Sequence, residues 1–82
     1  MEQTELIRNY KGKATYQIMV HGKVEPGFLQ RLNYLTVSHT EADGQIYSTL
    51  MGEIKDQGAL SGIINILIDH QYDVISVMKI GL

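Results

Sequence analysis

Two runs of alternating apolar and polar residues flank a pair of residues that favours a tight turn, and this arrangement constrains the fold most. The runs cover residues 35–40 and 45–54, and Asp43-Gly44 lies between them. Alternation with a period of two is typical of a strand, and Asp-Gly between two such runs is a strong hairpin signal. The sequence therefore predicts a β-hairpin. Its second strand should have Ile46, Ser48, Leu50, Gly52 and Ile54 on one face, and Tyr47, Thr49, Met51 and Glu53 on the other.

Further strands are predicted on both sides of this hairpin. Residues 14–24 alternate in the same way, with Tyr16, Ile18 and Val20 on one face. Residues 74–80 form a last apolar run, in which we expect Ile75 and Val77 to face a helix. The chain should thus contain four strands.

Two helices are predicted between the strands. Pro26 suits the first turn of a short helix that ends near Asn33 or Tyr34, with Phe28, Leu29 and Leu32 as its apolar positions. Asp56 can cap the other helix, which should end between Asp69 and Gln71, because its carboxylate accepts from the N–H groups of the first turn. Its apolar stripe has the spacing i, i+3, i+4 and i+7. The stripe consists of Leu60, Ile63, Ile64 and Leu67.

The order strand, helix, strand, strand, helix, strand predicts a ferredoxin-like βαββαβ sandwich of the α+β class. In that fold a four-stranded antiparallel sheet has both helices on one face. A short internal similarity between residues 22–32 and 52–63 agrees with it, since both halves then have the same strand-to-helix corner. We assign residues 1–12 to an N-terminal arm and residues 13–82 to a single domain.

Composition excludes several classes of protein. The chain of 82 residues has a net charge of −2 and only seven Lys and Arg residues, which argues against binding to nucleic acid or to an anionic membrane. Without cysteine it has no disulfide, cysteine zinc site or thiol nucleophile. The acidic start of the sequence does not resemble a signal peptide, and no apolar run is long enough to span a membrane. We expect a cytoplasmic protein.

We predict no catalytic residue, metal site or cofactor. His21, His39 and His70 have no metal-ligand spacing among them. Gly62 is unusual in the middle of a helix, where glycine costs about 1 kcal/mol relative to alanine. It predicts close packing against the first helix or a contact with another subunit.

The helix-free face of the sheet is the most informative predicted surface. It should combine methionines, hydroxyl side chains and a tyrosine, where a solvated face would carry Lys, Glu and Arg. Such semi-apolar faces favour a partner surface or a ligand platform. The residues that we predict to bind a partner or ligand are Met19, His21, Tyr47, Thr49, Met51, Ser76 and Met78. Gln17, Thr36, Ser38 and Ile80 should lie beside them.

Two segments resemble a group of small uncharacterised bacterial proteins. Residues 56–67, followed by Val74-Ile75-Ser76-Val77, carry the resemblance, and Tyr16 to Gly22 echoes the strand pattern Y-x-I-x-V-x-G of that group. The resemblance runs from about Tyr16 to Val77. It implies a shared fold and no particular activity.

The C-terminal half also resembles an ACT domain, a regulatory module that binds small ligands. In ACT domains the helix begins with acid-x-Pro-Gly-x-(Leu/Val), and a later strand often reads I-x-S-V. Here Gln57-Gly58 replaces Pro-Gly, and a weaker copy of the motif occurs at residues 25–29. This resemblance implies a regulatory or binding role.

Two functions compete on these observations. The first is a non-catalytic homodimeric module that binds a partner protein or a small ligand through the sheet face. The second is a small enzyme of the dimeric α+β barrel type, similar to muconolactone isomerases and small monooxygenases. In that enzyme, His21, Tyr47 and Ser76 would be the polar groups of a cavity on the sheet face.

Overall fold

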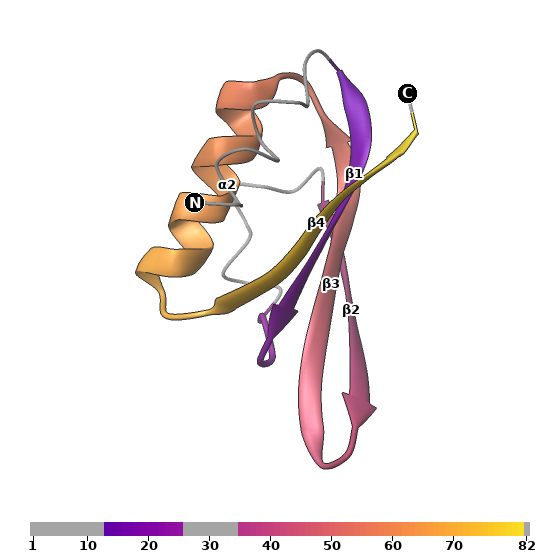
Figure 1. The fold of residues 1–82 in the computed structure, drawn as a ribbon, viewed down its shortest axis with the longest axis vertical. Helices are drawn as coiled ribbons and strands as arrows, with labels where there is room; N and C mark the ends of the chain where they lie inside the picture. The colour runs from indigo at the N-terminus through magenta and orange to yellow at the C-terminus, as the bar shows by residue number, and fades with distance from the viewer. Residues whose placement is uncertain (1–12, 26–34, 82) are drawn as a thin grey trace.

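A computed structural model describes residues 13–25 and 35–81. These residues form four strands and one helix: β1 (Ala14–His21), β2 (Leu35–Ala42), β3 (Gln45–Ile54), α2 (Gln57–Asp69) and β4 (Asp73–Gly81). The strands make one antiparallel sheet in the order β2-β3-β1-β4, and α2 covers one of its faces (Figure 1). The helix is not long and apolar enough to cross a membrane.

The predicted ferredoxin-like βαββαβ sandwich is therefore wrong, because the described residues place one helix on the sheet instead of two. The other predicted helix, from Pro26 to Asn33 or Tyr34, lies outside the described residues, as does the predicted arm over residues 1–12. The prediction rested on three apolar positions in a short segment that contains Gly27. Helices this short depend on tertiary packing more than on their own sequence, so the pattern was weak support.

The β2–β3 hairpin closes as the sequence predicts. Asp43 and Gly44 both have positive φ, 54° and 76°, as a type I′ turn requires, and Ala42 pairs with Gln45 across it. From there the register of β2 on β3 is regular to Leu35 opposite Gly52. The tip of this hairpin extends past the end of α2 (Figure 1).

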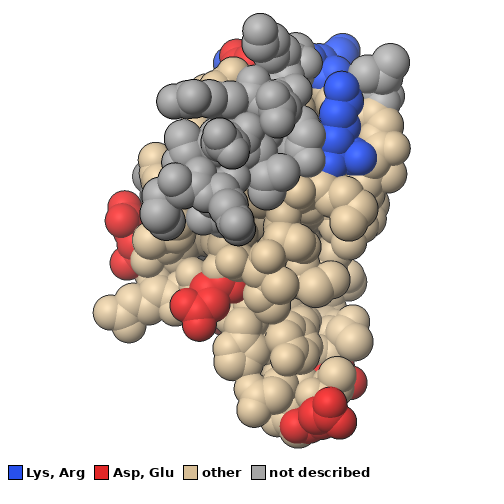
Figure 2. Space-filling model, in the orientation of Figure 1, with Lys and Arg blue, Asp and Glu red and all other residues tan. Residues whose placement is uncertain are grey.

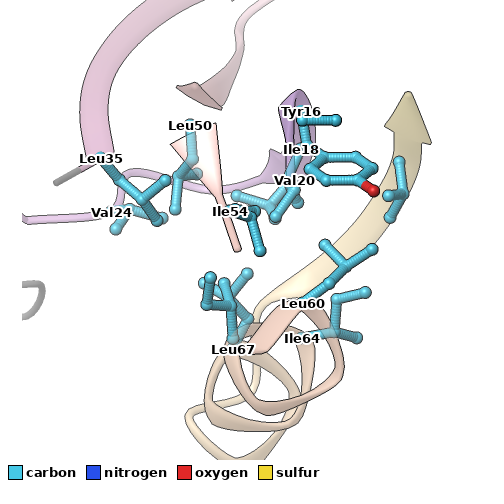
Figure 3. Packing of buried hydrophobic residues seen from close by; sticks show 13 residues of the cluster. Tyr16, Ile18, Val20, Val24, Leu35, Leu50, Ile54, Leu60, Ile64 and Leu67 are labelled. Atoms are coloured by element: carbon cyan, nitrogen blue, oxygen red, sulfur yellow. The ribbon is translucent and has the colours of Figure 1, made fainter. Parts of the chain in front are cut away.

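The core lies between α2 and the face of the sheet that carries Tyr16, Ile18 and Val20. From the helix, Leu60, Ile63, Ile64 and Leu67 enter this core, which confirms the predicted stripe (Figure 3). Asp56 caps the helix as predicted, since its Oδ1 accepts from the Ala59 N–H at 2.8 Å. Burial of this apolar stripe gives the helix most of its stability.

Ile75, which we predicted to face the helix, is exposed, and so is Ile46, which we placed on the same face of its strand as Leu50 and Ile54. In β4 the register shifts, so that Met19 pairs with Ser76 but Val20 pairs with Val74. The extra residue, Ile75, is 50% exposed, and Val74 packs against the core in its place. Ile46 is 40% exposed and lies near the tip of the hairpin, one pair away from the Ala42–Gln45 pair that closes the turn.

Strand β1 ends earlier than residue 24, and the backbone after it is bound by side chains of the hairpin. Gly22 adopts a φ of 115°, which turns the chain. The fully buried hydroxyl of Ser48 donates to the Gly22 carbonyl at 2.7 Å and accepts from the Val24 N–H at 2.9 Å. The His39 imidazole is 3.0 Å from the Val24 carbonyl. A carbonyl only accepts, so Nε2 of His39 carries the proton.

We expect Ser48→Ala to lower the free energy of unfolding by about 1–3 kcal/mol, because it leaves the buried Val24 N–H and the Gly22 carbonyl without this hydroxyl. Urea unfolding followed by circular dichroism would measure the change. Ser61→Ala is the matched control: Ser61 is half-buried on α2, away from the sheet, and its loss should change stability by no more than about 0.5 kcal/mol. Equal stability of the two variants would contradict the role assigned to Ser48.

Candidate functional site

The helix-free face of the sheet, which we call the open face, is ordered by the strand register. Residues paired across neighbouring strands point to the same side, so each set of partners forms a row across the sheet. The two central rows run through all four strands. One consists of Ser38, Thr49, Met19 and Ser76, and the other of Thr36, Met51, Gln17 and Met78.

These two rows contain no charged side chain. Met51 is 37% exposed and Met78 52% exposed, whereas Met19 is half-buried between its neighbours. The Thr36 hydroxyl donates to the Met51 carbonyl at 3.1 Å, and this bond holds the Thr36 side chain against the sheet. The centre of the open face is thus apolar sulfur and methyl surface interspersed with small hydroxyls.

A third row lies where β1 ends. There His21 pairs with Tyr47 on β3 and with Asp73 on β4. The His21 and Tyr47 rings have centroids 5.3 Å apart and planes inclined at 47°. The His21 Nε2 is also 2.5 Å from Oε1 of Gln45, so its ring is held from two sides by β3.

All seven residues of the predicted site therefore lie on the open face. The structure brings His21 and Tyr47 into contact, and places Ser76 in the adjacent row beside Met19. The three polar groups proposed for an enzyme cavity thus include one contacting pair and one separate hydroxyl. Whether any of them binds a ligand remains a prediction.

The other two histidines have structural contacts. His39 lies on the helix side of β2 and binds the Val24 carbonyl, as described above. His70 follows α2, and both its backbone N–H and its Nδ1 are within 3.1 Å of the Ile66 carbonyl, where they cap the end of the helix. Within residues 13–25 and 35–81, no three His, Asp or Glu side chains are grouped closely enough to hold a metal ion.

The sequence analysis missed the contacts made by Ser48 and Tyr72. Tyr72 donates from its hydroxyl to the Lys23 carbonyl at 3.2 Å, and its ring lies against Gly22. Only Ser48 had a detectable signal, as a hydroxyl among apolar residues on the core-facing side of its strand. A buried hydroxyl needs a partner, and here that partner is the backbone of residues 22–24.

Three lysines gather at one end of the sheet, and acidic residues lie at both ends, since Glu53 is 4.0 Å from Nζ of Lys13. Lys13, Lys55 and Lys79 lie at the end of the sheet where β1 begins and β3 and β4 finish. Glu41 and Asp43 lie at the opposite end, near the tip of the hairpin. Figure 2 shows the basic side chains gathered at one end of the molecule, whereas acidic side chains occur at several places, one of them at that same end.

Comparison with protein families gives one match. The family model described as a domain of unknown function (DUF8691) covers residues 15–78, which is more than half of the chain, and the protein belongs to that family. No curated protein and no solved structure matches. The family match covers every strand at least in part and all of α2, and it assigns no activity.

We expect His39→Ala to destabilise the protein by about 0.5–1.5 kcal/mol, because the variant loses the hydrogen bond to Val24. His21→Ala serves as its control, since the His21 ring bonds the exposed side chain of Gln45 and not a part-buried backbone group, so its loss should cost no more than about 0.5 kcal/mol. Thermal unfolding of both variants would rank them. A larger loss for His21 would mean that its contacts with Gln45 and Tyr47 contribute more to the fold than the His39 contact does.

Proposed function

We propose that this protein is a cytoplasmic, non-catalytic binding module that acts as a homodimer and uses the open face as its docking surface. The observation that carries the proposal is the composition of the two central rows. They combine three methionines with small hydroxyls and glutamine, and lack charge across all four strands. Methionine-rich, uncharged surface of this kind favours contact with another protein over contact with water.

The occupant that fits this face best is a second copy of the same chain. In a two-fold dimer the same surface patch occurs on both subunits, so a charge near the axis would meet a like charge. Here the central rows have none. The methionine side chains can also adapt their rotamers to an identical surface, since they are unbranched and flexible.

The charges at the ends of the sheet support a particular orientation. A two-fold axis that lies in the interface and runs across the strands places the end of one copy that carries Lys13, Lys55 and Lys79, together with Glu53, over the end of the other that carries Glu41, Asp43 and Asp73. Lys13 would then approach the region of His21 and Asp73 in the second copy. Complementary charges at the rim of an interface select the orientation and raise the association rate.

The size of the domain gives such an interface a further role. A chain of 82 residues buries a comparatively small fraction of its surface when it folds, so its stability as a monomer is modest. Association stabilises the folded state by mass action, because only folded subunits have the open face. A homodimer would therefore be more stable at higher protein concentration.

We expect Met51→Lys and Met78→Lys each to weaken the dimer by at least about a hundredfold. Each variant places two like charges in the interface, at a cost of several kcal/mol, and about 1.4 kcal/mol is a tenfold change in affinity. Native mass spectrometry and sedimentation over a range of protein concentrations would measure the dissociation constant. Native spectra would also show any small molecule that the protein retains.

Ile68→Lys provides the matched control. Ile68 is 49% exposed, a fraction similar to that of Met78, but it lies on α2, on the other side of the sheet. The variant should keep the dissociation constant of the parent protein. A monomeric parent protein, or equal effects of all three lysines, would refute the open face as the dimer contact.

A further inference from the structure

The two edges of the sheet differ in the features that prevent edge pairing. Strand β4 has two register shifts and carries Lys79, both of which discourage a further strand. Strand β2 pairs with β3 without a register shift over all eight of its residues and contains neither proline nor lysine. Among residues 13–25 and 35–81, no backbone hydrogen bond reaches the outer edge of β2.

The hairpin turn determines which backbone groups of β2 point outward. A two-residue turn is closed by a hydrogen-bonded pair, here Ala42 and Gln45. In an antiparallel ladder such pairs alternate with pairs whose N–H and C=O groups point away from the partner strand. The bond from the Gly22 N–H to the Ile46 carbonyl agrees, because Ile46 then points toward β1. The outward residues of β2 are Leu35, Val37, His39 and Glu41.

We infer that this edge is a second contact surface of the chain, at which two copies pair their β2 strands antiparallel about a two-fold axis at Ser38. In that register Val37 lies opposite His39 and Leu35 opposite Glu41. All four outward residues of each copy therefore find backbone partners. No shift of register or change of backbone geometry is needed.

The side chains on the open face are self-complementary in the same register. Thr36 lies opposite Thr40 of the other copy, and the two Ser38 residues meet at the axis. Cross-strand pairs of threonine and serine stabilise antiparallel ladders through their hydroxyls. The only charged side chain of β2, Glu41, lies opposite the apolar Leu35, so no like charges meet. These features favour a second copy over an unrelated peptide.

This edge contact is separate from the open-face contact, since it needs neither Met51 nor Met78. A chain that makes both isologous contacts would form a closed tetramer if the two axes intersect at a right angle and a larger assembly if they do not, and one that makes only one of them would form a dimer. The two proposals can therefore fail independently. The open-face variants described above should lose the open-face contact alone, so any dimer that they still form would be the edge-paired one.

Amide hydrogen exchange, measured by NMR on the full chain at several concentrations, tests the edge contact. Without the edge contact, the N–H groups of Val37, His39 and Glu41 exchange rapidly, whereas those of Thr36, Ser38 and Thr40 are protected by their hydrogen bonds to β3. Edge pairing should slow the outward amides by more than about tenfold at high concentration, and dilution should restore their exchange. Protection that persists on dilution would overturn the inference, because a segment of the same chain would then cover the edge.

Glu41→Pro and Glu41→Ala form a matched pair of variants for the same test. Both remove the same charge, and only proline removes the outward N–H, at a solvent-facing edge position where proline is tolerated. The proline variant should lose the protection at Val37 and His39, and the alanine variant should keep it. Equal protection in both variants, or rapid outward exchange in a parent protein that is dimeric, would refute the edge contact while leaving the open-face dimer standing.

Discussion

The buried hydroxyl of Ser48 joins the segment that follows β1 to the hairpin, and the path by which this segment enters the core depends on that connection. After Gly22, which has a positive φ, the chain leaves the sheet, so the backbone groups of the next residues lack the ladder partners that β3 and β4 provide to β1. Ser48 satisfies groups of Gly22 and Val24, and its cross-strand partner His39 satisfies the Val24 carbonyl. Val24 can then be fully buried in the core although it is not part of a strand.

The two faces of the hairpin have different roles. On the side of α2, residues of β2 and β3 bind the backbone after β1 and pack against the core. On the open face the same strands carry threonine, serine, tyrosine and methionine, with little contribution to the core. Because successive residues of a strand alternate between faces, one hairpin serves both purposes with no additional sequence.

Local patterns allowed most of the sheet to be predicted from the sequence. The Asp43-Gly44 turn fixed the register of the hairpin, and the spacing of the apolar residues of α2 identified its buried stripe. Ile75 was assigned to the wrong face because a register shift depends on the pairing of β4 with β1, which the alternation within β4 does not show. The prediction of a fold with two helices was wrong for a related reason. Pro26 and three apolar residues are weak evidence for a helix when the tertiary packing is unknown.

For the candidate site, alternation placed all seven predicted residues on one face, but it could not show how they are grouped. The contact between His21 and Tyr47 and the separation of Ser76 from them follow from strand order and register, which are properties of the whole sheet. The contacts of His39 and Tyr72 with the backbone of residues 23 and 24 join segments far apart in the chain. No local pattern of a single sequence encodes them.

Strand order has a consequence for how the protein is made. The first strand that the structure describes, β1, lies between β3 and β4, which are synthesised later. While the ribosome extends the chain, the β2–β3 hairpin can form from local contacts, but β1 keeps one side open until β4 emerges. Co-translational folding is therefore complete only when the last strand is available, and a nascent chain stalled before residue 73 would expose the backbone of its central strand to aggregation or to chaperones.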